Sequence, residues 1–168
     1  MRRALLACAV LLLTACPGEG TQRAPAAAAD GLQLTGRLAG HRVSVSDGEP
    51  EVTYGDCDLA DGDDTDLCIE SHTIDGAPIG LIIENPAALE VGVALEPVSS
   101  RANACALGCD DLHGGVVVRL RVGDGLAQAT VGRLRATKVG ERFAASFELE
   151  FGDDTVSGSF DVRPPVTP

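Results

Sequence analysis

The sequence predicts an all-β domain, built as an antiparallel β-sandwich of about eight or nine strands. Short segments alternate between apolar and polar residues with a period of two, the pattern of a strand with one buried face. Glycine and aspartate separate these segments, and both residues favour tight reversals of the chain. No stretch longer than about two turns has the 3.6-residue period of an amphipathic helix.

The clearest strand covers residues 143–151. Phe143, Phe147 and Leu149 share one parity, whereas Ser146 and Glu148 lie on the other. The other expected strands cover residues 32–38, 42–46, 51–54, 71–74, 79–84, 89–96, 116–122 and 156–162, and the segment 127–162 is expected to form a three-stranded meander.

One turn signal predicts a hairpin, but the sequence does not distinguish a sandwich from a closed barrel. Asp75-Gly76 separates residues 71–74 from residues 77–83, and this pair favours a two-residue hairpin turn. Antiparallel strands at this spacing form either a sandwich or a small barrel with a ligand cavity. The sandwich is the preferred prediction and the small β-barrel is the alternative.

The amino terminus carries a targeting signal. Two arginines precede an apolar run of about ten residues, which is shorter than the roughly 20 that span a bilayer. The run ends in small residues before a cysteine, in the order Leu13-Thr14-Ala15-Cys16. This pattern resembles the bacterial lipoprotein signal. The resemblance implies cleavage after residue 15, lipidation of Cys16, and a cell-envelope location facing the periplasm or the exterior. The alternative is an ordinary cleaved signal that leaves Cys16 as a free thiol.

The remaining chain divides into a tether, a domain and a tail. Residues 16–30 are rich in Ala, Gly and Pro, which suits a flexible linker. The β domain is expected at 31–163 and a short tail at 164–168. Loss of residues 1–15 removes two arginines, so 11 basic and 25 acidic residues remain, a formal charge of −14. Such a surface repels nucleic acid and anionic lipid, and favours cations or a basic envelope protein as partner.

Four cysteines remain after Cys16: Cys57, Cys68, Cys105 and Cys109. Exported proteins reach compartments that oxidise thiols, so two disulfides are expected. Of the three possible pairings, 57–68 with 105–109 is preferred because each bond closes a local loop. The first loop holds about a dozen residues, and its bond would stabilise the fold by up to about 3 kcal/mol.

An acidic segment lies inside the first of these loops and suggests a weak calcium site. It contains Asp56, Asp58, Asp61, Asp63, Asp64 and Asp66. The EF-hand spacing does not fit, because the glycine position counted from Asp56 holds another aspartate, and the twelfth position counted from Asp61 is a histidine. The preferred interpretation is a solvated acidic hairpin tip with no cofactor.

Zinc is the alternative at the second cysteine pair. Cys105, Cys109 and His113, with Asp110 or Asp111 as fourth ligand, could bind the metal. An oxidising compartment favours a disulfide there instead.

No catalytic motif is present in the sequence: it has no Gly-x-Ser-x-Gly elbow and no phosphate-binding glycine loop. His41, His72 and His113 lie far apart in the chain. A binding or structural module without enzymatic activity is therefore the preferred function. The alternatives are an envelope hydrolase with an irregular site and, if the fold is a barrel, a carrier of a small apolar ligand.

Overall fold

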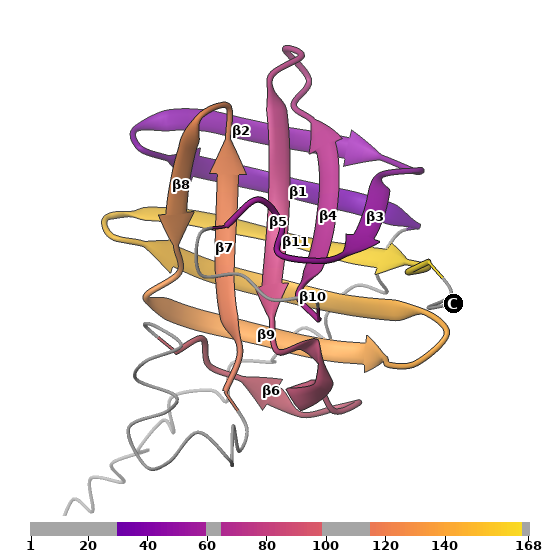
Figure 1. Ribbon diagram of the computed structural model, residues 1–168. Helices are drawn as coiled ribbons and strands as arrows, with labels where there is room; N and C mark the ends of the chain where they lie inside the picture. Colours follow the sequence, from indigo (N-terminus) through magenta and orange to yellow (C-terminus); the bar gives the residue numbers. More distant parts are fainter. Residues whose placement is uncertain (1–29, 60–64, 99–114, 166–168) are drawn as a thin grey trace, which may run out of the picture.

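The computed structural model describes residues 30–59, 65–98 and 115–165. They form two antiparallel sheets that pack face to face (Figure 1). Sheet A has the strand order β2-β1-β11-β10-β9-β6 and sheet B the order β3-β4-β5-β7-β8. The sheets do not close into a barrel, so the predicted β-sandwich is confirmed. No helix among the described residues has the length and apolar character needed to cross a membrane.

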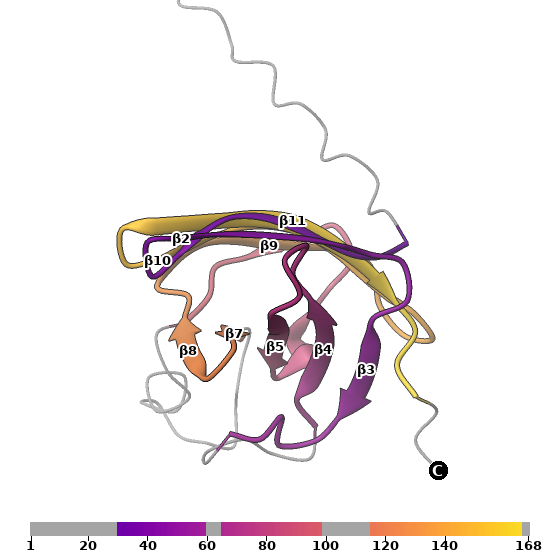
Figure 2. The same ribbon diagram turned by 90° about the horizontal axis from the view of Figure 1, so that it is seen from above.

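Sheet A is a curved layer that arches over sheet B (Figure 2). Its strands are β1 (Gly31–Leu38), β2 (His41–Asp47), β6 (Ala94–Leu95), β9 (Val131–Lys138), β10 (Phe143–Phe151) and β11 (Asp154–Val162). Gly158 in β11 pairs with Leu34 on one side and Phe147 on the other. A Cβ at Gly158 would lie 2.1 Å from the carbonyl oxygen of Gln33, so only glycine permits this close approach of β1 and β11.

Sheet B runs across the strands of sheet A (Figure 1). Its strands are β3 (Glu51–Tyr54), β4 (Leu67–His72), β5 (Pro78–Glu84), β7 (Val117–Val122) and β8 (Gly125–Gln128). Apolar side chains from both sheets form one core, and Leu32, Leu81 and Phe160 are almost completely buried within it. The alternation seen in the sequence therefore corresponds to a core-facing and a solvent-facing side in both layers.

The segment 89–96 is not the continuous strand that its alternation predicts. Gly92 has φ of 82° and donates its N–H to the carbonyl of Ala136 at 2.9 Å, which turns the chain there. Only Ala94–Leu95 pairs with β9, and the short 3₁₀ helix η1 (Pro86–Ala88) precedes it. With β8 as a separate strand, the described residues contain eleven strands, more than the eight or nine expected.

The β4–β5 hairpin also differs in detail from its prediction. Five residues separate the paired His72 and Pro78, so the turn is longer than two residues. The Thr73 hydroxyl donates to the Asp75 carboxylate, and Gly76 has φ of 88°. These interactions begin the turn at Thr73, so β4 ends at His72 and not at residue 74.

The tip of this hairpin contacts the edge of sheet A at β2. The N–H of Ile74 donates to the carbonyl of Ser44 at 2.9 Å. Nearby, the Ser71 hydroxyl donates to the Asp47 carboxylate at 2.5 Å. These two bonds connect the end of sheet B to the edge strand of sheet A.

Candidate functional site

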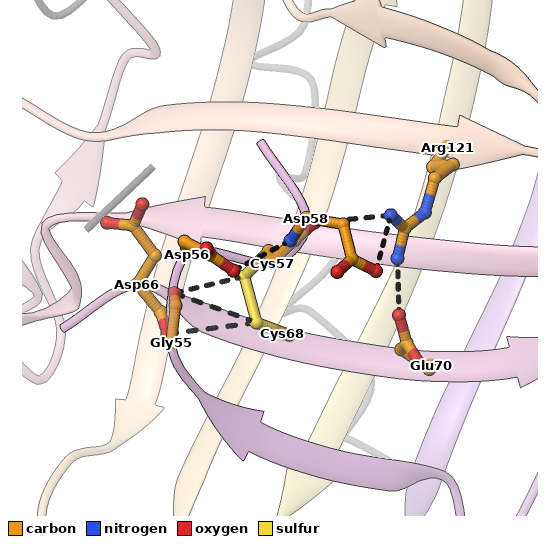
Figure 3. Close-up of a disulfide and its surroundings, with 8 residues drawn as sticks. All are labelled: Gly55, Asp56, Cys57, Asp58, Asp66, Cys68, Glu70 and Arg121. Carbon is orange, nitrogen blue, oxygen red and sulfur yellow. Dashed lines mark hydrogen bonds and ion pairs between the residues drawn. A yellow bond between two sulfur atoms is a disulfide. The ribbon is translucent and has the colours of Figure 1, made fainter. Parts of the chain in front are cut away.

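A disulfide joins Cys57, which follows β3, to Cys68 in β4 (Figure 3), so this predicted pairing is confirmed. Both cysteines are buried, and they pack with Leu59 and Ile82 in a small cluster separate from the main core. Cys68 and Ile82 are directly paired across β4 and β5. This satellite cluster therefore lies on the outer face of sheet B.

Cys57 of the disulfide belongs to a tight turn that runs from Asp56 to Leu59. The Leu59 N–H donates to the Asp56 carbonyl at 2.9 Å, and the Asp58 N–H donates to the Asp56 side chain at 3.0 Å. Cys57 and Asp58 have φ of 52° and 56°, in the left-handed region that residues other than glycine rarely occupy. The turn is thus held in a costly conformation by the bond, by these hydrogen bonds and by its neighbours.

Arg121 links this turn to the sheet (Figure 3). Gly80 pairs with Glu70 on one side and with Arg121 on the other, so the three residues form a row across β4, β5 and β7. Arg121 crosses β5 above Gly80 and pairs with the Glu70 carboxylate. The same guanidinium donates to the carbonyl of Cys57 at 3.2 Å and to the carboxylate of Asp58 at 3.4 Å.

A groove of about 480 Å³ lies over this row of residues. Side chains from β2 to β5, from β7 and from the connecting turns line it. Its charged members are five carboxylates and one guanidinium, with one histidine: Asp47, Glu49, Glu51, Asp58, Glu70, Arg121 and His72. With a neutral imidazole the groove has a formal charge of −4, and it attracts cations.

Two of these carboxylates directly oppose each other. Glu51 in β3 pairs with Glu70 in β4, and like charges at opposed positions of a sheet are unfavourable. Arg121 forms its ion pair with Glu70. Cation binding between the two strands would relieve the remaining repulsion.

Hydrogen bonds stabilise the ionised form of Asp47, one of the carboxylates of the groove. Hydrogen bonds from the Ser71 hydroxyl and the Glu49 N–H lower the pKa of the Asp47 carboxyl and outweigh the opposing effect of its partial burial. Asp47 is therefore a carboxylate at neutral pH and contributes to the negative charge of the groove.

The structure separates the acidic residues that the sequence grouped together. Asp58 faces the groove, Asp56 accepts the hydrogen bond within the turn, and Asp66 is fully buried. Within 30–59, 65–98 and 115–165, no group of three or more His, Cys, Asp or Glu side chains could hold a metal ion. The other predicted site residues lie outside the described residues: Cys16, Asp61, Asp63, Asp64, Cys105, Cys109, Asp110, Asp111 and His113.

Sequence reasoning missed the charged residues on the outer face of sheet B. Arg119 in β7 and Glu84 in β5 form an ion pair at 2.6 Å, and both side chains are buried. Arg121 lies two residues further on the same face. The alternation of residues 116–122 placed both arginines opposite the core, but it gave no sign of their partners in other strands.

A second charged network lies on the outer face of sheet A, where β1 begins and β11 ends. Asp161 in β11 accepts from Lys138 at 2.6 Å and from Arg142 at 2.7 Å, and Arg142 also contacts Asp30 at 3.1 Å. Burial by itself would raise the pKa of the Asp161 carboxyl, but the hydrogen bonds from Lys138 and Arg142 outweigh it, so this pKa is lowered. Anions and cations are balanced in this network.

Comparison of the chain with protein-family models, with curated proteins and with solved structures finds no match. The features that bear on function are therefore the fold, the disulfide and the charged groove.

Proposed function

We propose that the chain is a lipid-anchored binding module of the bacterial cell envelope, and that its groove binds a basic segment of another envelope protein. The signal ending in Cys16 supports the anchor. The Cys57–Cys68 disulfide supports export, because such bonds persist in oxidising compartments and are rare in the bacterial cytosol.

The observation that carries the binding role is the open, five-carboxylate groove on a sandwich whose interior is filled. A carrier of an apolar ligand needs an empty interior, whereas large side chains such as Leu81 and Phe160 occupy the space between these sheets. A concave surface available to a ligand is thus the groove along sheet B and the adjoining end of β2, and its chemistry is anionic.

The ligand chemistry follows from the charges that stay unbalanced. Arg121 serves Glu70 and Asp58, while Glu49 and Glu51 also contribute carboxylates to the groove. Guanidinium and ammonium groups of a basic peptide complement such a surface and form charge-assisted hydrogen bonds with it. Because these groups are largely solvent-exposed, the affinity would fall as the ionic strength rises.

Calorimetric titration of the mature protein in detergent tests the binding role. The probe is a peptide of alternating Arg and Lys, and the comparison peptide has Gln at every position. We expect binding of the basic peptide alone, weakening towards an ionic strength of about 0.15 M. The double substitution Glu51→Gln with Glu70→Gln should weaken binding about tenfold, since each exposed charge pair contributes up to about 1 kcal/mol.

A matched control makes the same change of charge elsewhere. Glu148→Gln with Glu150→Gln alters two exposed carboxylates of β10 on the outer face of sheet A, and it should leave the affinity unchanged. Equal weakening by both double variants would show a general charge effect and overturn the groove as the binding site.

Cell fractionation with intact-mass measurement tests the anchor. The wild-type chain should sediment with membranes and carry an acylated Cys16 as its first residue. Cys16→Ser should abolish both properties. An unmodified Cys16 in the mature protein would refute the anchor.

A further inference from the structure

The disulfide and the groove share the Asp56–Leu59 turn, and this suggests control of the site. We infer that the Cys57–Cys68 bond is a redox switch: the oxidised form holds the groove in its binding shape, and reduction weakens binding. The inference rests on the proposed function, because it concerns the regulation of that same groove.

The disulfide lies where its loss has a local effect. Cys57 and Cys68 belong to the satellite cluster with Leu59 and Ile82, on the opposite side of sheet B from the main core. Breaking the bond removes no side chain from the core that joins the two sheets. The fold should therefore persist while the turn changes.

The backbone of the turn favours such a change. Cys57 and Asp58 both occupy the left-handed region, which is unfavourable for residues with a Cβ. In the reduced protein the turn has lost its covalent link to β4 and depends on the two hydrogen bonds to Asp56 and the contacts of Arg121. Relaxation to extended backbone angles becomes favourable.

Relaxation of the turn would alter the groove in two ways. The Asp58 side chain is 87% exposed, so the backbone of the turn, and not side-chain packing, holds it beside Arg121. When the turn relaxes, the Asp58 carboxylate would therefore leave the groove. Arg121 would lose its acceptors on Cys57 and Asp58 but keep Glu70. The freed guanidinium could then contact other carboxylates of the groove and compete with a cationic ligand.

The switch needs a dithiol reductant. One reductant thiolate attacks a sulfur of the Cys57–Cys68 bond, that bond breaks, and a mixed disulfide forms. The second reductant thiolate resolves the mixed disulfide, so the reductant becomes a disulfide and the protein gains two electrons and two protons as two thiols. Cys57 and Cys68 are only 6% and 2% exposed, so attack requires prior opening of the turn and should be slow.

The experiment titrates the mature protein with the same Arg/Lys peptide before and after treatment with dithiothreitol. Mass spectrometry after alkylation of a parallel sample counts the free thiols. A variant with Cys105→Ser and Cys109→Ser isolates the effect of the Cys57–Cys68 bond. In both proteins, reduction should weaken peptide binding about fivefold, the effect of losing one exposed charge pair, and reoxidation should restore it.

A second variant removes the bond without reductant. Cys57→Ala with Cys68→Ala should bind the peptide as weakly as the reduced protein and should not respond to dithiothreitol. The strands β1, β10 and β11 should remain protected from hydrogen exchange on reduction, since a local switch leaves them folded.

The contrary outcomes distinguish failure of the redox switch from failure of the proposed binding function. If the protein with both thiols free binds as tightly as the oxidised form, the switch is refuted and the groove remains the binding site. Loss of exchange protection throughout the protein on reduction also refutes it, because reduction would then unfold the whole domain. Failure of the oxidised protein to bind any basic peptide refutes the proposed function, and the switch with it.

Discussion

The outer faces of the two sheets carry similar rows of charged residues, but the row on sheet B has surplus carboxylates and the network on sheet A is balanced. In each sheet, a small residue on one strand lies between oppositely charged residues on its two neighbours. In sheet B the row is Glu70, Gly80 and Arg121. Arg121 there forms ion pairs with two carboxylates, those of Glu70 and Asp58, and its side chain is 24% exposed.

In sheet A the row is Lys138, Ala144 and Asp161. Here the Asp161 side chain, 4% exposed, pairs with both Lys138 and Arg142, and Arg142 also pairs with Asp30. A buried charge whose partners surround it contributes to stability, and its removal leaves those partners unpaired. An exposed charge among surplus carboxylates contributes little to stability and leaves negative charge available to a ligand. Burial and charge balance thus separate a stabilising network from a candidate binding surface.

Removing the central charge of each network should give the largest contrast. Asp161→Ala removes the acceptor that Lys138 and Arg142 share and leaves Arg142 its pair with Asp30, and it should lower the free energy of unfolding by about 2 kcal/mol. Arg121→Ala removes a cation that is partly exposed and should cost less than about 1 kcal/mol. Urea denaturation of both variants measures this difference, and equal losses would contradict the contrast between the two faces.

Acid should weaken the network of sheet A. The folded pKa of Asp161 lies below its ordinary value of about 3.9. Its contribution to stability is therefore complete above that value and is lost as the pH falls through the folded pKa. Urea midpoints measured from neutral pH down to pH 2 should fall more steeply for the wild type than for Asp161→Asn. Parallel curves would show that this carboxyl does not contribute.

The smallest effect is expected at the centre of the sheet B row. A Cβ at Gly80 would lie 3.6 Å from Nε of Arg121, an ordinary contact. Gly80→Ala should therefore change the free energy of unfolding by no more than about 0.5 kcal/mol, in the stabilising direction, because alanine loses less backbone entropy on folding. Thermal denaturation measures the change, and a loss above about 1 kcal/mol would show that Arg121 needs the glycine.

Local signals in the sequence were sufficient for the fold class and for one disulfide. Alternation over 143–151 identifies β10, because a strand with one buried face repeats every two residues. The Cys57–Cys68 bond follows from the short loop it closes. Alternation failed at 89–96, since Gly92 introduces a turn that a period-two pattern does not reveal.

The groove could not be predicted, because it depends on the pairing of strands that are distant in the sequence. Glu70, Gly80 and Arg121 form a row only once β5 pairs with β7 in the observed register. A shift of one residue would place Arg121 on the other face of the sheet. No local pattern specifies that register, which follows from the packing of the whole sandwich.

The hairpin tip over β2 has a further consequence for a protein that an anchor would concentrate on a membrane. Exposed strand edges of neighbouring copies can join into a continuous sheet and aggregate. In β2 (His41–Asp47), the Ser44 carbonyl at the centre of the strand already accepts the N–H of Ile74. A second copy could not pair along the full length of this edge. The hairpin of one sheet thus protects the edge of the other against self-association in a crowded layer.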